Sequence, residues 1–119
     1  MVGLARRTVE EFGTRDVYEI ARRLGASIDF ARWPLVTAGE CEAGAIRVNL
    51  AALERAPHCT GWFSRDGLAR IIVAHELGHL LAERWNMEGD RSEVWVHEFV
   101  RELLELPFDP VECERFWRR

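Results

Sequence analysis

The segment RIIVAHELGHLLAERW, residues 70–85, places two histidines and a glutamate within a predicted apolar helix. His75 and His79 are four residues apart, so both imidazoles project from one helix face, one turn apart. This spacing allows both rings to bind one metal ion, with nitrogen atoms about 2.0–2.1 Å from a zinc. Glu76 lies one helical step away from that line, so its carboxylate can hold a water molecule beside the metal. The pattern is the HExxH motif, which supplies two ligands and a general base.

The alternative to a metal site is that His75 and His79 are neutral, hydrogen-bonded histidines in the core. Polar residues among Ile, Val and Leu are costly unless something compensates them, and an unpaired buried Glu76 is difficult to sustain. Gly78 also fits a functional helix, because it lets another segment or a substrate approach closely. A glycine inside a helix otherwise costs about 0.5–1 kcal/mol relative to alanine. We therefore predict a metal site on this helix.

A catalytic zinc site needs a third protein ligand and an open position. The candidates lie on the next predicted helix, SEVWVHEFVRELLELP, residues 92–107. The core-facing line of this helix is predicted to consist of Glu93, Val96, Val100 and Leu103. We predict Glu93 as the ligand, ahead of His97 on a neighbouring line and Glu98 further round the helix. The alternatives are a solvated carboxylate at a helix N-terminus for Glu93 and an ordinary half-buried histidine for His97. His58 is the remaining histidine.

The residues before the metal helix predict a small α+β fold. Apolar residues at helical spacing predict a helix over residues 17–24, and Gly25 is expected to end it. The segments SIDFARW and AGAIRVNL favour strands, and the segment between them is rich in turn residues. We expect two or three antiparallel strands here. Asn49 is predicted to cap a brief helical turn that Pro57 ends.

The boundaries of the two site helices follow from their capping and breaking residues. Ser64 or Asp66 is expected to cap the metal helix, which runs through Trp85. The second helix is expected to run from about Ser92 to Leu106, where the following proline stops it. The predicted fold is therefore α+β: a small antiparallel sheet packed with an HExxH zinc helix and a ligand-bearing helix.

Composition limits the class of protein. At 119 residues the chain predicts one domain over residues 1–119. A net charge of −4 argues against a dedicated nucleic-acid surface. The sequence has no run of roughly 18 apolar residues and no signal peptide, so we expect a cytoplasmic protein. The three cysteines are odd in number and form no CxxC pair, which argues against a disulfide framework and a thiolate zinc site.

The order of these motifs resembles that of the ImmA/IrrE metallopeptidases over about residues 16–107. In that family an amphipathic helix ending near LG precedes a strand such as SIDF, and a glycine-bearing hairpin leads to a strand similar to AIRVN. The zinc helix is similar to IIVAHELGHLLAE. The last helix resembles the family pattern E-x-x-A-x-x-F-A-x-x-L-L through Glu93, Val96, Phe99-Val100 and Leu103-Leu104.

The resemblance implies a compact α+β zinc peptidase fold, with His75 and His79 as ligands, Glu76 as the base and an acidic ligand on the last helix. This chain departs from the family in that helix. Two small alanines are valines here, and the common asparagine is His97. Trp95 replaces a residue that is often acidic and that is itself a plausible family ligand.

Known members of the family cleave helix-turn-helix repressors in phage, mobile-element or stress circuits. The resemblance therefore implies a zinc-dependent endopeptidase whose partner is a protein substrate of that kind. The net charge and the lack of a long apolar run predict no direct nucleic-acid or membrane binding. A zinc-binding interaction protein, which binds a repressor or antitoxin without cleaving it, is the alternative. An intact Glu76 favours the enzyme, because a structural site needs no general base. A closed site, with Glu93 and His97 both on zinc, would favour the interaction protein.

Overall fold

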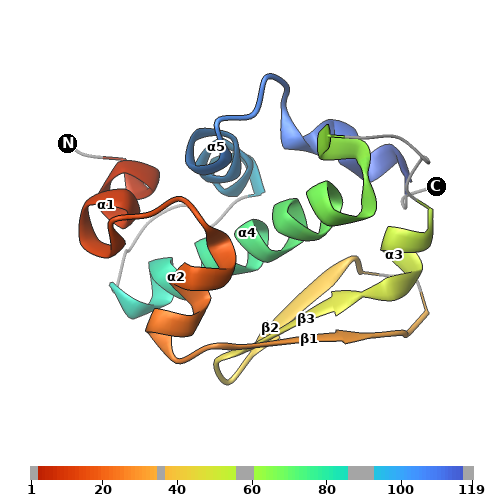
Figure 1. The fold of residues 1–119 in the computed structure, drawn as a ribbon, viewed down its shortest axis with the longest axis horizontal. Coiled ribbons are helices and arrows are strands. Elements are labelled where there is room, and N and C mark those ends of the chain that lie inside the picture. Colours follow the sequence, from red (N-terminus) through yellow and green to blue (C-terminus); the bar gives the residue numbers. More distant parts are fainter. Residues whose placement is uncertain (1–2, 35–36, 56–60, 86–92, 117–119) are drawn as a thin grey trace.

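The computed structural model describes residues 3–34, 37–55, 61–85 and 93–116. In chain order the elements are α1 (Leu4–Phe12), α2 (Val17–Leu24), β1 (Ser27–Ala31), β2 (Gly39–Glu42), β3 (Ala45–Asn49), α3 (Leu50–Glu54), η1 (Gly61–Phe63), α4 (Arg65–Arg84), α5 (Glu93–Leu104) and η2 (Pro110–Phe116). The sheet lies on one side of α4 and α5 lies on the other (Figure 1), which confirms the α+β class. None of the described helices has the length and apolar character needed to cross a membrane.

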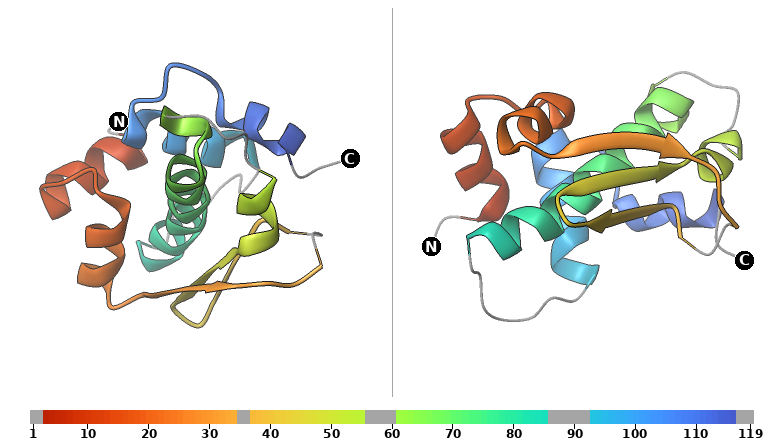
Figure 2. Two further views of the ribbon diagram at one scale, coloured as in Figure 1. Left: turned by 45° about the vertical axis from the view of Figure 1, so that its right-hand side comes forward. Right: turned by 90° about the horizontal axis from the view of Figure 1, so that it is seen from below.

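The three strands form a mixed sheet in the order β1–β3–β2, which Figure 2 shows from below. β2 pairs with β3 in the expected antiparallel direction, but β1 pairs with β3 in parallel, so the expected all-antiparallel sheet is wrong for β1. The cause is the position of β2. After β1 the chain forms β2, which lies at the opposite edge of the sheet from β1. The β2–β3 hairpin then places β3 between β1 and β2. β3 therefore runs in the direction of β1, and β2 is an edge strand.

A two-residue turn joins β2 to β3 and fixes their register. Ala43 and Gly44 have φ angles of 50° and 78°. Two consecutive positive φ angles are typical of the type I′ turn, whose twist matches that of the flanking strands. In the resulting register Cys41 lies opposite Ile46, and Ile46 is fully buried against the helices. β2 therefore turns alternate residues towards α4.

Helix α4 begins at a side-chain cap. The hydroxyl of Ser64 accepts a hydrogen bond from the N–H of Gly67 at 3.1 Å, so Ser64 is the cap, and Asp66 lies in the first turn. The helix ends at Arg84 and Trp85 is its C-cap, within one residue of the predicted end. The sheet and α5 cover opposite sides of α4, which buries apolar residues around most of its circumference, among them Leu68, Ile72, Leu77 and Leu81.

Helix α5 ends at Leu104, two residues before the predicted end at Leu106. Glu105 leaves the helix with a φ of 55°, and Leu106 precedes a proline, a position that disfavours the helical conformation. The predicted start near Ser92 and the predicted stop of α3 at Pro57 lie outside the described residues. The apolar members of the predicted core-facing line are fully buried: Val96, Val100 and Leu103.

Helix α2 agrees with its prediction. The carboxylate of Asp16 caps it by accepting a hydrogen bond from the N–H of Tyr18 at 3.0 Å. The helix ends at Gly25, which has a φ of 77° and is the residue expected to stop it. The core-facing side chains of α2 are Val17, Ile20 and Ala21.

Helix α1 is an element that the sequence reasoning missed. Its buried residues, Leu4, Ala5 and Thr8, have helical spacing, which is the signal that predicts such a helix. The Thr8 hydroxyl donates a hydrogen bond to the carbonyl of Leu4 at 2.7 Å, so this polar residue is buried without an unpaired hydroxyl. The stacked rings of Phe12 and Trp85, 6.5 Å apart, join α1 to the end of α4.

Asn49 is fully buried and forms hydrogen bonds with three segments of the chain. Its side-chain oxygen accepts a hydrogen bond from the N–H of Ala51 at 3.0 Å, which confirms it as the cap of α3. Its side-chain amide donates to the carbonyl oxygens of Trp33 at 3.2 Å and Thr37 at 2.9 Å. Its backbone N–H donates to the carbonyl of Ala38 at 2.8 Å. Asn49 therefore holds the connection that leads into the edge strand β2.

Replacing Asn49 by alanine should lower the free energy of unfolding by about 2–4 kcal/mol, because it removes a helix cap and the two hydrogen bonds that the buried amide donates to Trp33 and Thr37. Denaturant titration followed by circular dichroism measures the change. Asp16→Ala is the matched control, because it removes only the exposed cap of α2 and should cost about 1 kcal/mol. Equal losses in the two variants would contradict the role of Asn49 in the connection.

Candidate metal centre

The two histidines of the HExxH segment lie in the second half of α4. The ring centroids of His75 and His79 are 5.2 Å apart, with 66° between the ring planes. Two imidazoles bound to one tetrahedral zinc through nitrogens at about 2.0–2.1 Å have centroids about 5 Å apart. Both residues are half-buried, so they combine a fixed position with access from solvent. Their spacing fits a shared metal ion.

Glu76 is charged and yet only 9% exposed. It lies on the side of α4 that faces the edge strand β2. A methyl group at Gly39 of β2 would come within 3.4 Å of Cγ of Glu76 and within 2.6 Å of Cγ2 of Ile72. β2 passes this close to α4 because residue 39 has no side chain. The Glu76 side chain therefore lies between α4 and the edge strand β2.

Cys41 is a half-buried residue of β2 that packs against the core. Burial raises the pKa of its thiol to about 11, and the carboxylates of Glu76 and Glu83 add to the increase. The electrostatic effect of Glu76 is further evidence that its carboxylate lies near β2. In the absence of a metal the Cys41 thiol is therefore protonated at neutral pH.

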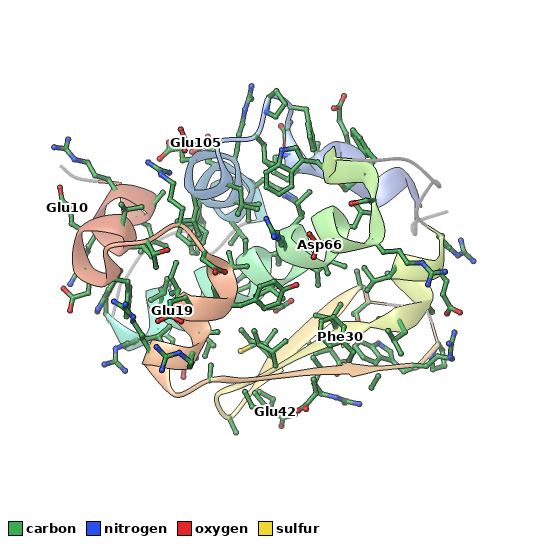
Figure 3. All side chains as sticks on the ribbon, viewed as in Figure 1. Glu10, Glu19, Phe30, Glu42, Asp66 and Glu105 are labelled. Atoms are coloured by element: carbon green, nitrogen blue, oxygen red, sulfur yellow. The ribbon has the colours of Figure 1, made fainter. Side chains whose placement is uncertain are left out.

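Gly39 and Cys41 are residues near the site that sequence reasoning missed. They belong to β2, which falls in the segment expected to be rich in turns. The signal that points to Gly39 is a glycine inside a strand, which often marks a close approach of another backbone or side chain. Figure 3 shows Glu42, the last residue of β2, on the outer side of the sheet, away from α4.

Helix α5 crosses α4 at Gly78. A Cβ atom at this position would lie 2.9 Å from Cδ2 of Phe99 and 3.6 Å from Cγ1 of Val96. Figure 1 views α5 nearly along its axis while α4 runs across the page, so the two helices cross steeply. The predicted role of Gly78, to permit the close approach of another segment, is confirmed, and that segment is α5.

The crossing brings two aromatic side chains of α5 to the histidine pair. The ring centroid of His97 lies 5.5 Å from that of His75, at 61° between planes. The ring centroid of Trp95 lies 6.1 Å from that of His79, at 77°. The indole Nε1 of Trp95 is buried and has no hydrogen-bond partner among the described residues. A buried donor without an acceptor costs about 1–3 kcal/mol, and the described residues offer this indole no acceptor.

The third ligand remains a prediction. Glu93 is the first residue of α5, one helical turn before His97, and its side chain lies outside the described part of the structure. Glu98 is exposed, and His58 lies in an undescribed segment. Across the described side chains, no three His, Cys, Asp or Glu residues are arranged to hold a metal. His75 and His79 therefore remain the candidate metal-binding pair, and among the described side chains His97 does not complete a three-donor set.

Comparison of the chain with protein-family models, curated proteins and solved structures finds no match. Any interpretation of function therefore depends on the residues themselves, on their geometry, and on the order of motifs that resembles the ImmA/IrrE family.

Substituting alanine for Gly78 should lower the free energy of unfolding by about 1–2 kcal/mol, although alanine favours a helix, because the new Cβ overlaps the Phe99 ring. Thermal denaturation measures the loss. Gly3→Ala is the control, since its Cβ would make only an ordinary 3.7 Å contact with Oε2 of Glu102. A Gly78→Ala variant at least as stable as the wild type would contradict the tight crossing.

Proposed function

We propose that this protein is a zinc-dependent endopeptidase of the ImmA/IrrE type. The observation that carries the proposal is the position of Glu76, a buried carboxylate next to two histidines whose ring spacing fits one zinc ion. A structural zinc site has no use for a further carboxylate beside its ligands, whereas a hydrolytic site needs a general base there. His75 and His79 would hold the zinc, with Glu93 as the third ligand.

Zinc bound by these residues would supply a Lewis acid that polarises the scissile carbonyl and acidifies a water molecule. Glu76 would accept a proton from the water as its oxygen bonds to the carbonyl carbon. It would then deliver that proton to the nitrogen of the leaving amine as the C–N bond breaks. The low exposure of Glu76 supports this role, because bulk water is largely excluded from the proton transfer.

The edge strand β2 would position the main chain of the substrate. Among the described residues β2 pairs with β3 on one side only, so its other side can pair with an extended peptide. Gly39 of β2 lies against Glu76, so a peptide paired with β2 would run past the general base. The identity of the substrate as a cytoplasmic helix-turn-helix repressor comes from the family resemblance alone.

A zinc-binding interaction protein is the second candidate. It would keep the metal for folding and bind a repressor or antitoxin without cleaving it. The contact between His97 and His75 bears on this candidate, because a metal bound by both histidines of α4 together with His97 and Glu93 would have no open position for a substrate. The described side chains of His75, His79 and His97 are not arranged to hold a metal together, which counts against the closed site. The enzyme remains the better proposal, because the closed site leaves Glu76 without a role.

Purified protein should bind about one zinc ion per chain, and His79→Ala should abolish the binding because one of two adjacent ligands is lost. Metal analysis after dialysis against a weak chelator measures this. Glu93→Ala should weaken zinc binding far more than Glu98→Ala, its matched control on the same helix. Full zinc retention by the His79→Ala variant would rule out the metal site.

Glu76→Gln keeps the shape of the side chain but cannot accept a proton. The variant should fold and bind zinc normally, and its cleavage rate should fall by about 10²–10⁴-fold. The assay is incubation with a helix-turn-helix repressor encoded by a neighbouring gene, with fragment masses as the readout and chelator-treated wild type as control. A wild type that binds the repressor and leaves it intact under every metal condition would favour the interaction protein.

A further inference from the structure

His97 lies at the centre of the contact between α5 and the histidine pair. It is half-buried, its Nδ1 atom is buried, and its ring lies 5.5 Å from that of His75 at 61°. His97 follows Glu93, the first residue of α5, by one helical turn. A histidine in contact with a proposed ligand can act on the proposed metal site in two ways. It can bind the metal itself, or it can hold the His75 ring in position.

The described geometry argues against a direct role. If His97 were a ligand, its donor atom would converge with those of His75 and His79 on one point. No three described His, Cys, Asp or Glu side chains are arranged in that way. The distance between the rings of His97 and His75 is compatible with a hydrogen bond between a nitrogen of one ring and a nitrogen of the other.

A ligand histidine needs such support. Only one ring nitrogen of an imidazole binds the metal, and the other usually makes a hydrogen bond that fixes the tautomer and the orientation of the ring. The described rings in edge contact with His75 are those of His79 and His97. His79 is itself a proposed ligand, whereas His97 comes from α5 and reaches the His75 ring from outside the ligand pair, so it is placed to give this support.

We propose that His97 is a positioning residue that orients the His75 ring for metal binding, through a hydrogen bond between the two imidazoles. When one ring nitrogen of neutral His75 binds the metal, the other carries the proton, so His75 donates its N–H and a ring nitrogen of His97 accepts. The inference rests on the proposed zinc site and adds to it. It assigns a role to a residue at which the chain departs from the resembled family, where an asparagine is common.

The role predicts a graded loss of metal affinity. His97→Ala should weaken zinc binding by about 10–100-fold, the usual effect of removing a residue that supports a ligand. Competition with a chromophoric zinc chelator measures the affinity. The visible spectrum of the Co²⁺-saturated variant should match that of wild type, because all ligands remain. Glu98→Gln, which changes an exposed neighbour on α5, should leave both readouts unchanged.

Conservative substitutions test the hydrogen bond itself. His97→Asn places an amide near the position of Nδ1, and His97→Gln places one near the position of Nε2. One of the two should recover most of the zinc affinity, and which one succeeds identifies the ring nitrogen that faces His75. If His97→Ala does not fold, the ring-nitrogen resonances of zinc-loaded wild type provide the test. His75 and His79 should then show metal-bound nitrogens, and His97 should not.

Other results would overturn the inference. Unchanged zinc affinity in His97→Ala would show that the ring contact has no role at the site. A changed Co²⁺ spectrum, or metal-bound nitrogen in His97, would make His97 a ligand instead. Both results are compatible with a zinc peptidase. If wild type binds no zinc, or if His79→Ala binds it normally, the proposed function fails and this inference fails with it.

Discussion

The contact between the Phe99 ring and the backbone of α4 at Gly78 sets how closely the two helices of the site approach. Because residue 78 has no side chain, α5 packs directly on α4. The crossing point adjoins His79 and lies one turn from His75, so residues on the flanks of α5 reach both rings. A larger residue at position 78 would separate the helices and remove α5 from the histidine pair.

The opposite side of α4 depends on a second glycine. Gly39 lets the edge strand β2 pass against Ile72 and Glu76, and Asn49 fixes the segment that leads into this strand. Burial of a carboxylate opposes folding unless a cation or hydrogen bonds compensate it. Under the proposed function, zinc held by the adjacent histidines would place a positive charge close to this carboxylate.

Local signals predicted the elements of the fold better than their arrangement. Ser64, Asn49 and Gly25 are caps or stops that act within one helical turn, and all three lie where the sequence placed them. The direction of β1 was not predictable in this way, because it depends on β3 returning between two earlier strands. Helix α1 was missed, although its buried residues have helical spacing, because its apolar face is short and includes Thr8.

In the candidate site, too, the sequence predicted the local arrangement of residues but not the contacts between distant segments. The sequence by itself determined that His75 and His79 share a helix face and that Glu76 lies beside them, because helical geometry is local and fixes residues a few positions apart. Only the tertiary structure decided that His97 meets His75 and that Gly39 lies against Glu76. These contacts join segments far apart in the chain. They depend on how α5 crosses α4 and on which strand occupies the sheet edge, and no short stretch of sequence contains that information.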